Sequence, residues 1–133
     1  SLGLIMLDLD KFKKINDTYG HLYGDYILKE VGKIIKENVR TIDVVGRFGG
    51  EEFSVILVNT NVRDCIPLAK RIVEGINRKT FIFDGIATNL TISAGMSGYP
   101  SMSKESKELI KMADDAMYQT KKKGGNDVTI FQS

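Results

Sequence analysis

Two pairs of carboxylates stand next to apolar stretches of this 133-residue chain. Asp8 and Asp10 end one apolar run, and Glu51 and Glu52 begin another. Carboxylate oxygens are the ligands that Mg²⁺ prefers, and the ion keeps positions for water and substrate phosphates. Two such ions can stabilise both the attacking and the leaving oxygen of an in-line phosphoryl displacement. The pairs therefore predict metal-assisted phosphoryl chemistry if the fold brings them together, whereas either pair alone could simply lie in a solvated turn.

Gly49 and Gly50 lie directly before the glutamate pair and between two apolar runs rich in β-branched residues, at 44–48 and 53–58. Such runs indicate strands, and a two-glycine connection indicates a tight hairpin turn in which the backbone takes positive φ. Two adjacent carboxylates at the edge of an apolar strand cost free energy unless a cation or a hydrogen-bond donor compensates them. The segment predicts a hairpin tip that holds a charged ligand.

The apolar periodicity of the remaining chain predicts the elements that position these pairs. The predicted elements are a strand over 4–10, a loop with a short helical turn over 11–20, helices over 21–40, 62–76 and 103–123, a hairpin over 44–48 and 53–58, and strands over 80–84, 89–95 and 128–131. Pro67 lies either in the first turn of the second helix, after an Asp64 cap, or at a kink. Gly124 and Gly125 end the third helix, where a left-handed residue is favoured.

The order strand, helix, hairpin, helix, strand predicts an α+β fold, with an antiparallel-containing sheet and helices packed on one face. This is the ferredoxin-like or palm-type arrangement of polymerases and nucleotide cyclases. In that topology the first strand lies beside the hairpin at the centre of the sheet. Asp8 and Asp10 are therefore expected next to Glu51 and Glu52.

The amino-acid composition indicates a globular protein and limits the partners that it could bind. A length of 133 residues suits a single domain, and 42% hydrophobic with 27% charged residues is ordinary for a globular protein. The net charge of +2 gives no ground for binding nucleic acid or a membrane surface, which needs a concentrated basic face. Cys65 is the only cysteine, which excludes an intrachain disulfide and indicates a reduced, cytoplasmic setting. No apolar run has the length of a membrane span.

Four longer segments follow one another along the chain. Residues 8–25 read DLDKFKKINDTYGHLYGD, residues 49–53 read GGEEF, residues 91–95 read TISAG and residues 113–121 read ADDAMYQTK. Together they resemble the signatures of the GGDEF family of diguanylate cyclases, which join two GTP molecules into cyclic di-GMP. The resemblance extends over the whole chain and implies a GGDEF catalytic domain over 1–133.

The resemblance implies a metal site and a catalytic set at the two acidic pairs. Metal binding falls to the Asp8 carboxylate, the Leu9 backbone carbonyl and Glu51, with Glu52 close by. The implied cofactor is Mg²⁺, with Mn²⁺ as an alternative and two ions in each half-site. Glu51 is also implied as the group that activates the 3′-hydroxyl, a role that suits a carboxylate beside a metal. Arg47 matches another basic position of the family and completes the catalytic set.

The resemblance also implies a nucleotide site. Asn16 and Asp25 match the positions that read guanine, and an amide and a carboxylate suit the donors and acceptors of that base. The other implied contacts are His21 near the same substrate and, for the triphosphate, the backbone amides around Lys11 and Phe12 with Lys13 and Lys121. Taken alone, Asn16 could equally form a local turn, and Asp25 could simply favour the first turn of its helix.

A second, inhibitory site is implied by Arg40-Thr41-Ile42-Asp43, which resembles the RxxD motif where the product binds as a dimer. Arg71 lies where the family often supplies a second arginine. The planar guanidinium can bond phosphates and guanine edges and can stack on the base. An arginine at a helix C-terminus that pairs with a nearby aspartate is the structural alternative.

Two departures from the family pattern affect these expectations. The segment with an LTGL-x-NR signature that usually comes first in the family does not occur in this sequence, which implies a fragment of a larger sensor protein that could itself be anchored to a membrane. Gly125 stands where the family commonly has Arg or Lys, which weakens the implied contacts with phosphate.

The implied function is the condensation of two GTP into cyclic di-GMP and two pyrophosphate across a homodimer, with inhibition by the product. One alternative is a catalytically weak domain that only binds GTP or cyclic di-GMP, against which the intact acidic residues argue. Another is a cyclase with a mixed adenine and guanine product, against which Asp25 argues. No nucleic-acid partner and no direct membrane contact of this segment are expected.

Overall fold

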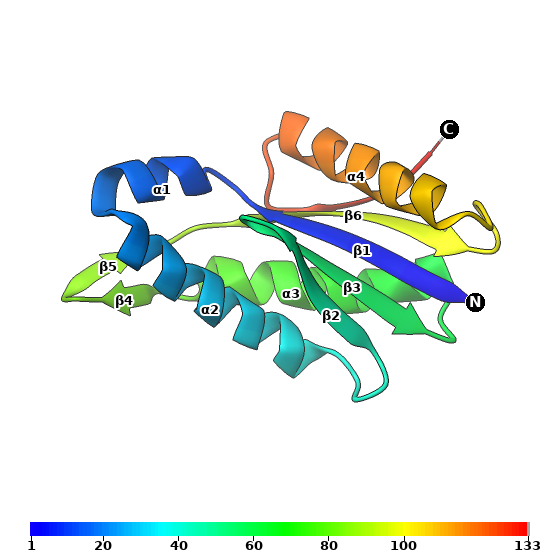
Figure 1. The fold of residues 1–133 in the computed structure, drawn as a ribbon, viewed down its shortest axis with the longest axis horizontal. Coiled ribbons are helices and arrows are strands. Elements are labelled where there is room, and N and C mark those ends of the chain that lie inside the picture. Colours follow the sequence, from blue (N-terminus) through cyan, green and yellow to red (C-terminus); the bar gives the residue numbers. More distant parts are fainter. Residues whose placement is uncertain (133) are drawn as a thin grey trace.

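The computed structural model describes residues 1–132 and places a five-stranded sheet at the centre of the chain (Figure 1). The elements are β1 (Leu2–Leu9), α1 (Phe12–Tyr19), α2 (His21–Asn38), β2 (Val44–Gly49), β3 (Glu52–Val58), the 3₁₀ turn η1 (Val62–Cys65), α3 (Ile66–Arg78), β4 (Phe81–Phe83), β5 (Ile86–Thr88), β6 (Ile92–Tyr99), α4 (Ser106–Lys122) and β7 (Val128–Ile130). The strands of the large sheet follow the order β2-β3-β1-β6-β7, which confirms the predicted α+β class.

Strand β1 is the centre of the sheet because it pairs antiparallel with β3 on one side and with β6 on the other. Ile5, Leu7 and Leu9 of this strand are completely buried, as its apolar run predicts. The register places Asp8 opposite Glu52 on β3 and opposite Ser93 on β6. The expectation that the first strand lies beside the hairpin is therefore confirmed.

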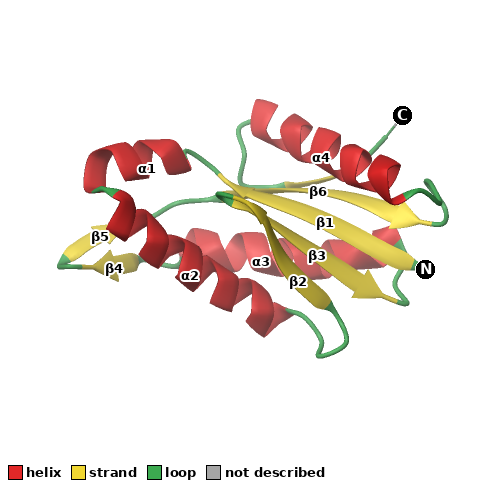
Figure 2. Cartoon of the chain, in the orientation of Figure 1, coloured by secondary structure: helices red, strands yellow, loops and turns green. Residues whose placement is uncertain are grey.

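Helices cover both faces of the sheet, whereas the sequence predicts helices on one face (Figures 1 and 2). Ile5 and Leu7 point into the main core, which they share with α2 and α3. Met6 points the other way and packs against Ala113 and Met117 of α4. Because side chains alternate along a strand, the apolar residues on both faces of β1 require cover on both sides.

Two short elements differ from the prediction. The segment after β1 forms the helix α1, which its buried residue Phe12 anchors to the core, and not merely a loop with a turn. The strands β4 and β5 pair with each other as a separate hairpin beside α2 (Figure 2). The hydroxyl of Tyr23 on α2 lies 2.9 Å from the carbonyl oxygen of Ile86 and ties this hairpin to the helix. Its three-residue strands are too short to give a clear alternation in the sequence.

Pro67 lies in the first turn of α3, which confirms the first of the two alternatives. A proline is tolerated there because the first backbone N–H groups of a helix have no partner within the helix. The cap differs from the prediction. The side chain of Asn61 accepts a hydrogen bond from the Asp64 backbone N–H at 3.1 Å and so begins the preceding 3₁₀ turn η1.

Asp10 follows the end of β1 and joins three parts of the chain. Its Oδ2 accepts hydrogen bonds from the Thr91 hydroxyl at 2.6 Å and from the Asn126 backbone N–H at 3.0 Å. Its Oδ1 accepts from the Ser93 hydroxyl at 2.6 Å and from Lys121 Nζ at 3.1 Å. Burial alone would raise the pKa of Asp10, but these hydrogen bonds hold it below its usual value. The carboxylate thus fixes the end of β1 to β6, to α4 and to the loop after α4.

Gly125 lies directly against this carboxylate. Its φ of +75° is in the left-handed region, as the predicted end of the third helix requires. A Cβ at this position would stand only 2.6 to 2.9 Å from the carboxylate atoms of Asp10. A basic side chain at position 125 would therefore displace Asp10, which accounts physically for the glycine.

We expect Gly125→Ala to destabilise the domain more than Gly85→Ala does. Gly85 has a similar φ of +77° but no atom within 4 Å of its would-be Cβ, so its substitution costs only the left-handed backbone strain, about 1 kcal/mol. Gly125→Ala also disrupts hydrogen bonds to a charged group, which adds at least about 1 kcal/mol. Urea unfolding of the two variants measures the difference, and equal losses of stability would contradict this role of Asp10.

Candidate active site

The Asp8 carboxylate lies at the end of the central strand and lacks a hydrogen-bond donor. Its Oδ1 is buried and has no hydrogen-bond partner within residues 1–132. Burial raises the pKa of Asp8 to about 7; the ammonium of Lys121 opposes this rise, and the neighbouring carboxyl groups of Glu51 and Glu52 add to it. A buried carboxylate near two others binds a cation favourably, because the cation removes both the desolvation cost and the repulsion.

Glu52 belongs to the same group of acids. It is the register partner of Asp8, and Glu51 precedes it in the hairpin turn. Burial raises the pKa of Glu52, and repulsion from Asp114 on α4 and from Glu51 raises it further. The end of the first strand therefore lies beside the glutamate pair, as predicted. Asp10 does not face the glutamates in this way, because it accepts its hydrogen bonds from Thr91, Ser93, Lys121 and the Asn126 N–H.

The hairpin tip closes differently from the prediction. Gly50 and Glu51 form the turn, and neither Gly49 nor Gly50 takes a positive φ, so the left-handed turn inferred from this glycine pair is wrong. The register of β2 and β3 shifts between Arg47 and Gly49. Such an irregularity increases the local twist, and here the chain reverses without left-handed residues. No atom lies within 4 Å of a Cβ built on either glycine, so the tip is open. Arg47 Nε donates to the Gly50 carbonyl oxygen at 3.0 Å and braces it.

Lys121 extends from the last turn of α4 to the end of β1. Its Nζ donates to the Leu9 carbonyl oxygen at 3.2 Å and forms ion pairs with Asp10 Oδ1 at 3.1 Å and with Asp8 Oδ1 at 3.6 Å. The ammonium therefore contacts two of the oxygens that the sequence assigns to a metal ion, those of Asp8 and Leu9. Lys121 is the cationic side chain that balances these oxygens in the structure.

The oxygens around Asp8 suit a hard divalent cation that takes only one or two protein carboxylates. No three His, Cys, Asp or Glu side chains of residues 1–132 are gathered closely enough to hold a metal ion by themselves. Mg²⁺ commonly takes one or two carboxylates and completes its coordination with water and substrate phosphates. The buried Oδ1 of Asp8, the Leu9 carbonyl and the nearby glutamates fit such a site, and the contact of Lys121 with the first two shows that they accept a cation.

Asn16 on α1 and Asp25 on α2 both lie near the junction of these two helices. The Oδ1 atom of Asn16 is buried and has no hydrogen-bond partner among the described residues. The Asn16 side chain lies against the backbone of Gly24, where a Cβ would overlap it. Asp25, the next residue, is exposed, as is His21 at the start of α2. The junction therefore holds the Asn16 amide against Gly24 and leaves the Asp25 carboxylate exposed.

The residues predicted to contact a triphosphate surround the start of α1. Lys11 precedes the helix with a φ of 58°, and Phe12 is its first residue. The side chains of Lys11 and Lys13 are exposed, whereas that of Phe12 is buried in the core. The side chain of Phe12 is therefore not available to a ligand, and the predicted contact through its backbone N–H stays a prediction.

Arg40 and Asp43 form a tightly bonded pair next to the end of α2. Arg40 Nη2 donates to Asp43 Oδ1 at 2.7 Å, and the Asp43 side chain is completely buried while that of Arg40 is 50% exposed. Burial alone would raise the pKa of Asp43, but the hydrogen bonds from Arg40 and from the Val58 N–H hold it below its usual value. Arg71 Nη2 lies 3.3 Å from the Asn38 carbonyl oxygen, so the second predicted arginine reaches the same surface.

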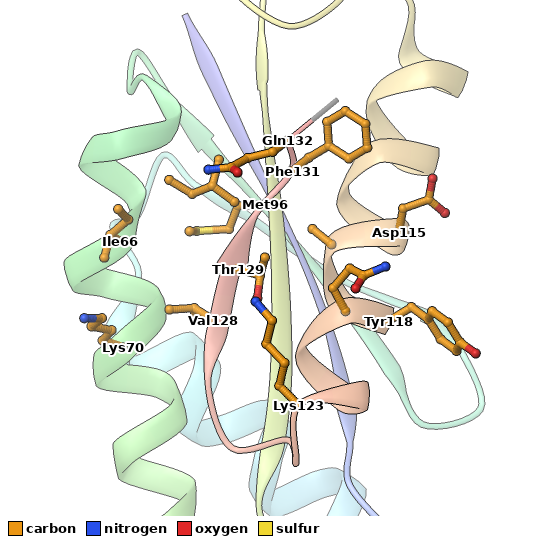
Figure 3. A pocket seen from close by; sticks show the side chains of 13 residues that line it. Ile66, Lys70, Met96, Asp115, Tyr118, Lys123, Val128, Thr129, Phe131 and Gln132 are labelled. Atoms are coloured by element: carbon orange, nitrogen blue, oxygen red, sulfur yellow. The ribbon is translucent and has the colours of Figure 1, made fainter.

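A separate hollow of about 740 Å³ lies between α3 and α4 along β7 (Figure 3). Lys70 lines it from α3, Asp115 and Tyr118 line it from α4, and Lys123 lines it from the end of that helix. None of the predicted site residues lines this hollow. It is therefore distinct from the acidic group at the end of β1.

Sequence reasoning missed two contributors to the site. Asp114 on α4 raises the pKa of Glu52. Thr91, directly before β6, and Ser93, in β6, hold Asp10 through their hydroxyls. The alternation of Thr91 and Ser93 was the available signal for the second contributor, because both hydroxyls fall on one face of a strand. No local pattern signals Asp114, since its closeness to Glu52 depends on how α4 packs on the sheet.

No helix among residues 1–132 combines the length and the apolar character that crossing a membrane requires.

The sequence matches the family described as "Diguanylate cyclase, GGDEF domain" over residues 1–127. Diguanylate cyclase A of Treponema denticola is 44% identical over 133 residues, which are 100% of this chain and 36% of that protein. The chain thus spans well under two thirds of this relative.

Two solved structures share the fold. The GGDEF domain of YfiN, also called TpbB, from Pseudomonas aeruginosa has a TM-score of 0.94 at 29% identity and covers 99% of this chain and 83% of its own. The GGDEF domain of DgcB from Caulobacter crescentus was solved in complex with c-di-GMP and has a TM-score of 0.92 at 27% identity. The match covers 99% of this chain and 76% of the DgcB chain. With the match over residues 1–127, these similarities show that the chain belongs to the GGDEF domain family of diguanylate cyclases.

Proposed function

We propose that this domain, as part of a homodimer, condenses two GTP into cyclic di-GMP and two pyrophosphate. The observation that carries the proposal is the buried Oδ1 of Asp8, which has no hydrogen-bond donor among residues 1–132, beside Glu51 and Glu52 at the end of the central strand. Fold stability alone gives no reason to place a buried carboxylate near two glutamates, because their mutual repulsion is unfavourable. A ligand that brings positive charge explains the arrangement.

The chain's own residues supply positions and proton transfer in the proposed reaction. Glu51, in the open hairpin turn, accepts the proton of the attacking 3′-hydroxyl. Lys121 and the backbone N–H groups around Lys11 and Phe12 hold the triphosphate, while Lys13 and Arg47 add positive charge around it. When bound, Mg²⁺ or Mn²⁺, two ions in each half-site, neutralises the charge that builds on the α-phosphate. Asp8, the Leu9 carbonyl, Glu51 and Glu52 hold the ions.

Guanine is the proposed base. Asp25 accepts hydrogen bonds from the N1–H and the 2-amino group, and the amide of Asn16 donates to O6 or N7. The support for this assignment is that the Asn16 side chain lies against Gly24 on α2, and that Asp25, the residue after Gly24, is exposed. His21 lies one helical turn earlier on α2 and faces the same substrate.

Two copies are needed because each domain holds one nucleotide. The 3′-hydroxyl of the GTP on one domain attacks the α-phosphate of the GTP on its partner, so that catalysis depends on the orientation of the two copies. The open hairpin tip, with no atom near Gly49 or Gly50, supports an approach by a second copy at this edge.

The decisive test is cyclic di-GMP production by the domain fused to a dimerising helix, with GTP and Mg²⁺. We expect product from the wild-type fusion and from Glu37→Gln, a control that removes an exposed acid of α2. Glu51→Gln should reduce the rate at least about 100-fold, because it removes the proton acceptor without changing the size of the side chain.

Chromatography of the nucleotides measures this reaction. An unchanged rate for Glu51→Gln would contradict the role of this residue. Absence of product from every fusion would contradict the cyclase proposal and favour a domain that only binds GTP or cyclic di-GMP. The second candidate has one observation in its favour, because Gly125 supplies no basic side chain to the phosphates.

We also propose that Arg40, Asp43 and Arg71 form an inhibitory site for the product. Asp43 is buried and holds the guanidinium of Arg40 through two hydrogen bonds, so that the half-exposed Arg40 is ordered before any ligand arrives. Arg71 adds a second guanidinium at the same surface. The DgcB domain solved with c-di-GMP supports affinity for this ligand in the family.

We expect Arg71→Ala to weaken cyclic di-GMP binding at least about 10-fold, since loss of a guanidinium that contacts phosphate or base costs more than 1 kcal/mol. Arg71 makes only one hydrogen bond, to the Asn38 carbonyl, so its loss should leave the fold intact. Arg63→Ala serves as the control because Arg63 is exposed in η1. Calorimetric titration measures both affinities, and equal affinities would argue against this site.

A further inference from the structure

The ammonium of Lys121 stands among the oxygens that the proposed metal site uses. It contacts the Leu9 carbonyl oxygen at 3.2 Å, Asp10 Oδ1 at 3.1 Å and Asp8 Oδ1 at 3.6 Å. Two of these three contacts, to Asp8 and Leu9, are to proposed metal ligands. The third contact anchors the lysine to Asp10, which belongs to the hydrogen-bonded centre between β1, β6 and the loop after α4.

A lysine ammonium and a divalent cation cannot both remain close to these oxygens at low cost. Mg²⁺ and Mn²⁺ bind oxygen at about 2.1 Å, so a metal on Asp8 and Leu9 would lie within a few ångströms of the ammonium. Repulsion between charges of +2 and +1 at such a distance disfavours their presence together. One of the two cations has to move.

We propose that Lys121 competes with the divalent cation for the oxygens of Asp8 and Leu9 and leaves them when nucleotide arrives. Without nucleotide, the lysine weakens metal binding. With nucleotide, the triphosphate offers the ammonium a new partner, and the metal gains phosphate ligands as well. Lys121 thereby makes the binding of metal and the binding of GTP depend on each other. This inference rests on the metal site of the proposed function.

The surroundings of Lys121 allow the movement. The lysine has a flexible four-carbon stem, and its side chain is 29% exposed at the end of α4. Asp10, its strongest partner, retains the hydrogen bonds from Thr91, Ser93 and the Asn126 N–H after the lysine departs. The departure therefore leaves no buried carboxylate without a donor at Asp10. At Asp8, the arriving metal replaces the lysine.

Titration of the nucleotide-free domain with Mn²⁺, followed by the paramagnetic resonance of free Mn²⁺, tests the competition directly. We expect Lys121→Met to bind Mn²⁺ at least about 5-fold more tightly than wild type, because a positive charge beside the site is removed. Lys122→Met is the matched control. It changes the net charge equally, but Lys122 lies over the Tyr118 ring at 5.2 Å and not at the acids, so less than about a 2-fold change is expected.

Lys121→Gln guards against a change caused by altered folding. It removes the charge but keeps a polar side chain with N–H donors at this position, so it should show the same gain in Mn²⁺ affinity. Binding of 3′-deoxy-GTP, which lacks the attacking hydroxyl, should move in the opposite direction and weaken in both variants in the presence of saturating Mn²⁺. If Lys121 had only a structural role, its substitution would not raise the affinity for Mn²⁺ and lower the affinity for 3′-deoxy-GTP.

The outcomes separate this inference from the proposed function. Mn²⁺ affinity of Lys121→Met and Lys121→Gln equal to or weaker than that of wild type would overturn the competition, and so would an absence of Mn²⁺ binding by all three proteins. Loss of Mn²⁺ binding in Asp8→Asn is expected if the metal site is correct. A domain that makes no cyclic di-GMP, yet shows the expected gain in affinity, would contradict the cyclase and leave the competition standing.

Discussion

The carboxylate of Asp8 at the end of the central strand is the constraint on which the site depends. β1 pairs on both sides and is covered on both faces, so the residue at its end cannot move to water without disturbing two strand pairings. The carboxylate is partly buried, and its pKa of about 7 expresses the cost of that burial beside two glutamates. Positive charge must come either from a side chain or from a ligand.

Asp8 and Asp10 are two residues apart and have opposite electrostatic environments. Four donors satisfy Asp10 and lower its pKa, whereas Oδ1 of Asp8 has none within hydrogen-bond distance. Carboxylates whose environments move their pKa values apart commonly have different roles. Asp10 is therefore best understood as a positioning residue that holds Lys121 and the loop after α4, while Asp8, held only by the longer ion pair with Lys121, is the one left to bind a ligand. The glycine at 125 follows from the same division, because only a residue without a side chain fits against Asp10.

The sequence was sufficient for the features that depend on local pattern and strand order. The apolar run before Asp8 predicts a buried strand, and the order of elements places it beside the hairpin, so the opposition of Asp8 and Glu52 could be expected. The role of Asp10 could not, because its partners come from β6 and from beyond α4, and only the folded chain brings them together. The prediction of a left-handed turn at Gly49 and Gly50 is wrong for a related reason. A register shift in β2, which no residue type signals, increases the local twist before the turn.

Helix α2 connects the two proposed ligand sites and also keeps them apart. His21 and Asp25 lie in its first turns, and Arg40 follows its last residue, Asn38. A helix of 18 residues is about 27 Å long, which exceeds the reach of any arginine side chain. The side chain of Arg40 therefore does not reach a base held at His21 and Asp25 of the same domain. In the proposed function, inhibition at Arg40 acts on the approach of the second copy. In that proposal the acids at the hairpin tip of one domain form only one side of the reaction, and the second copy supplies the other.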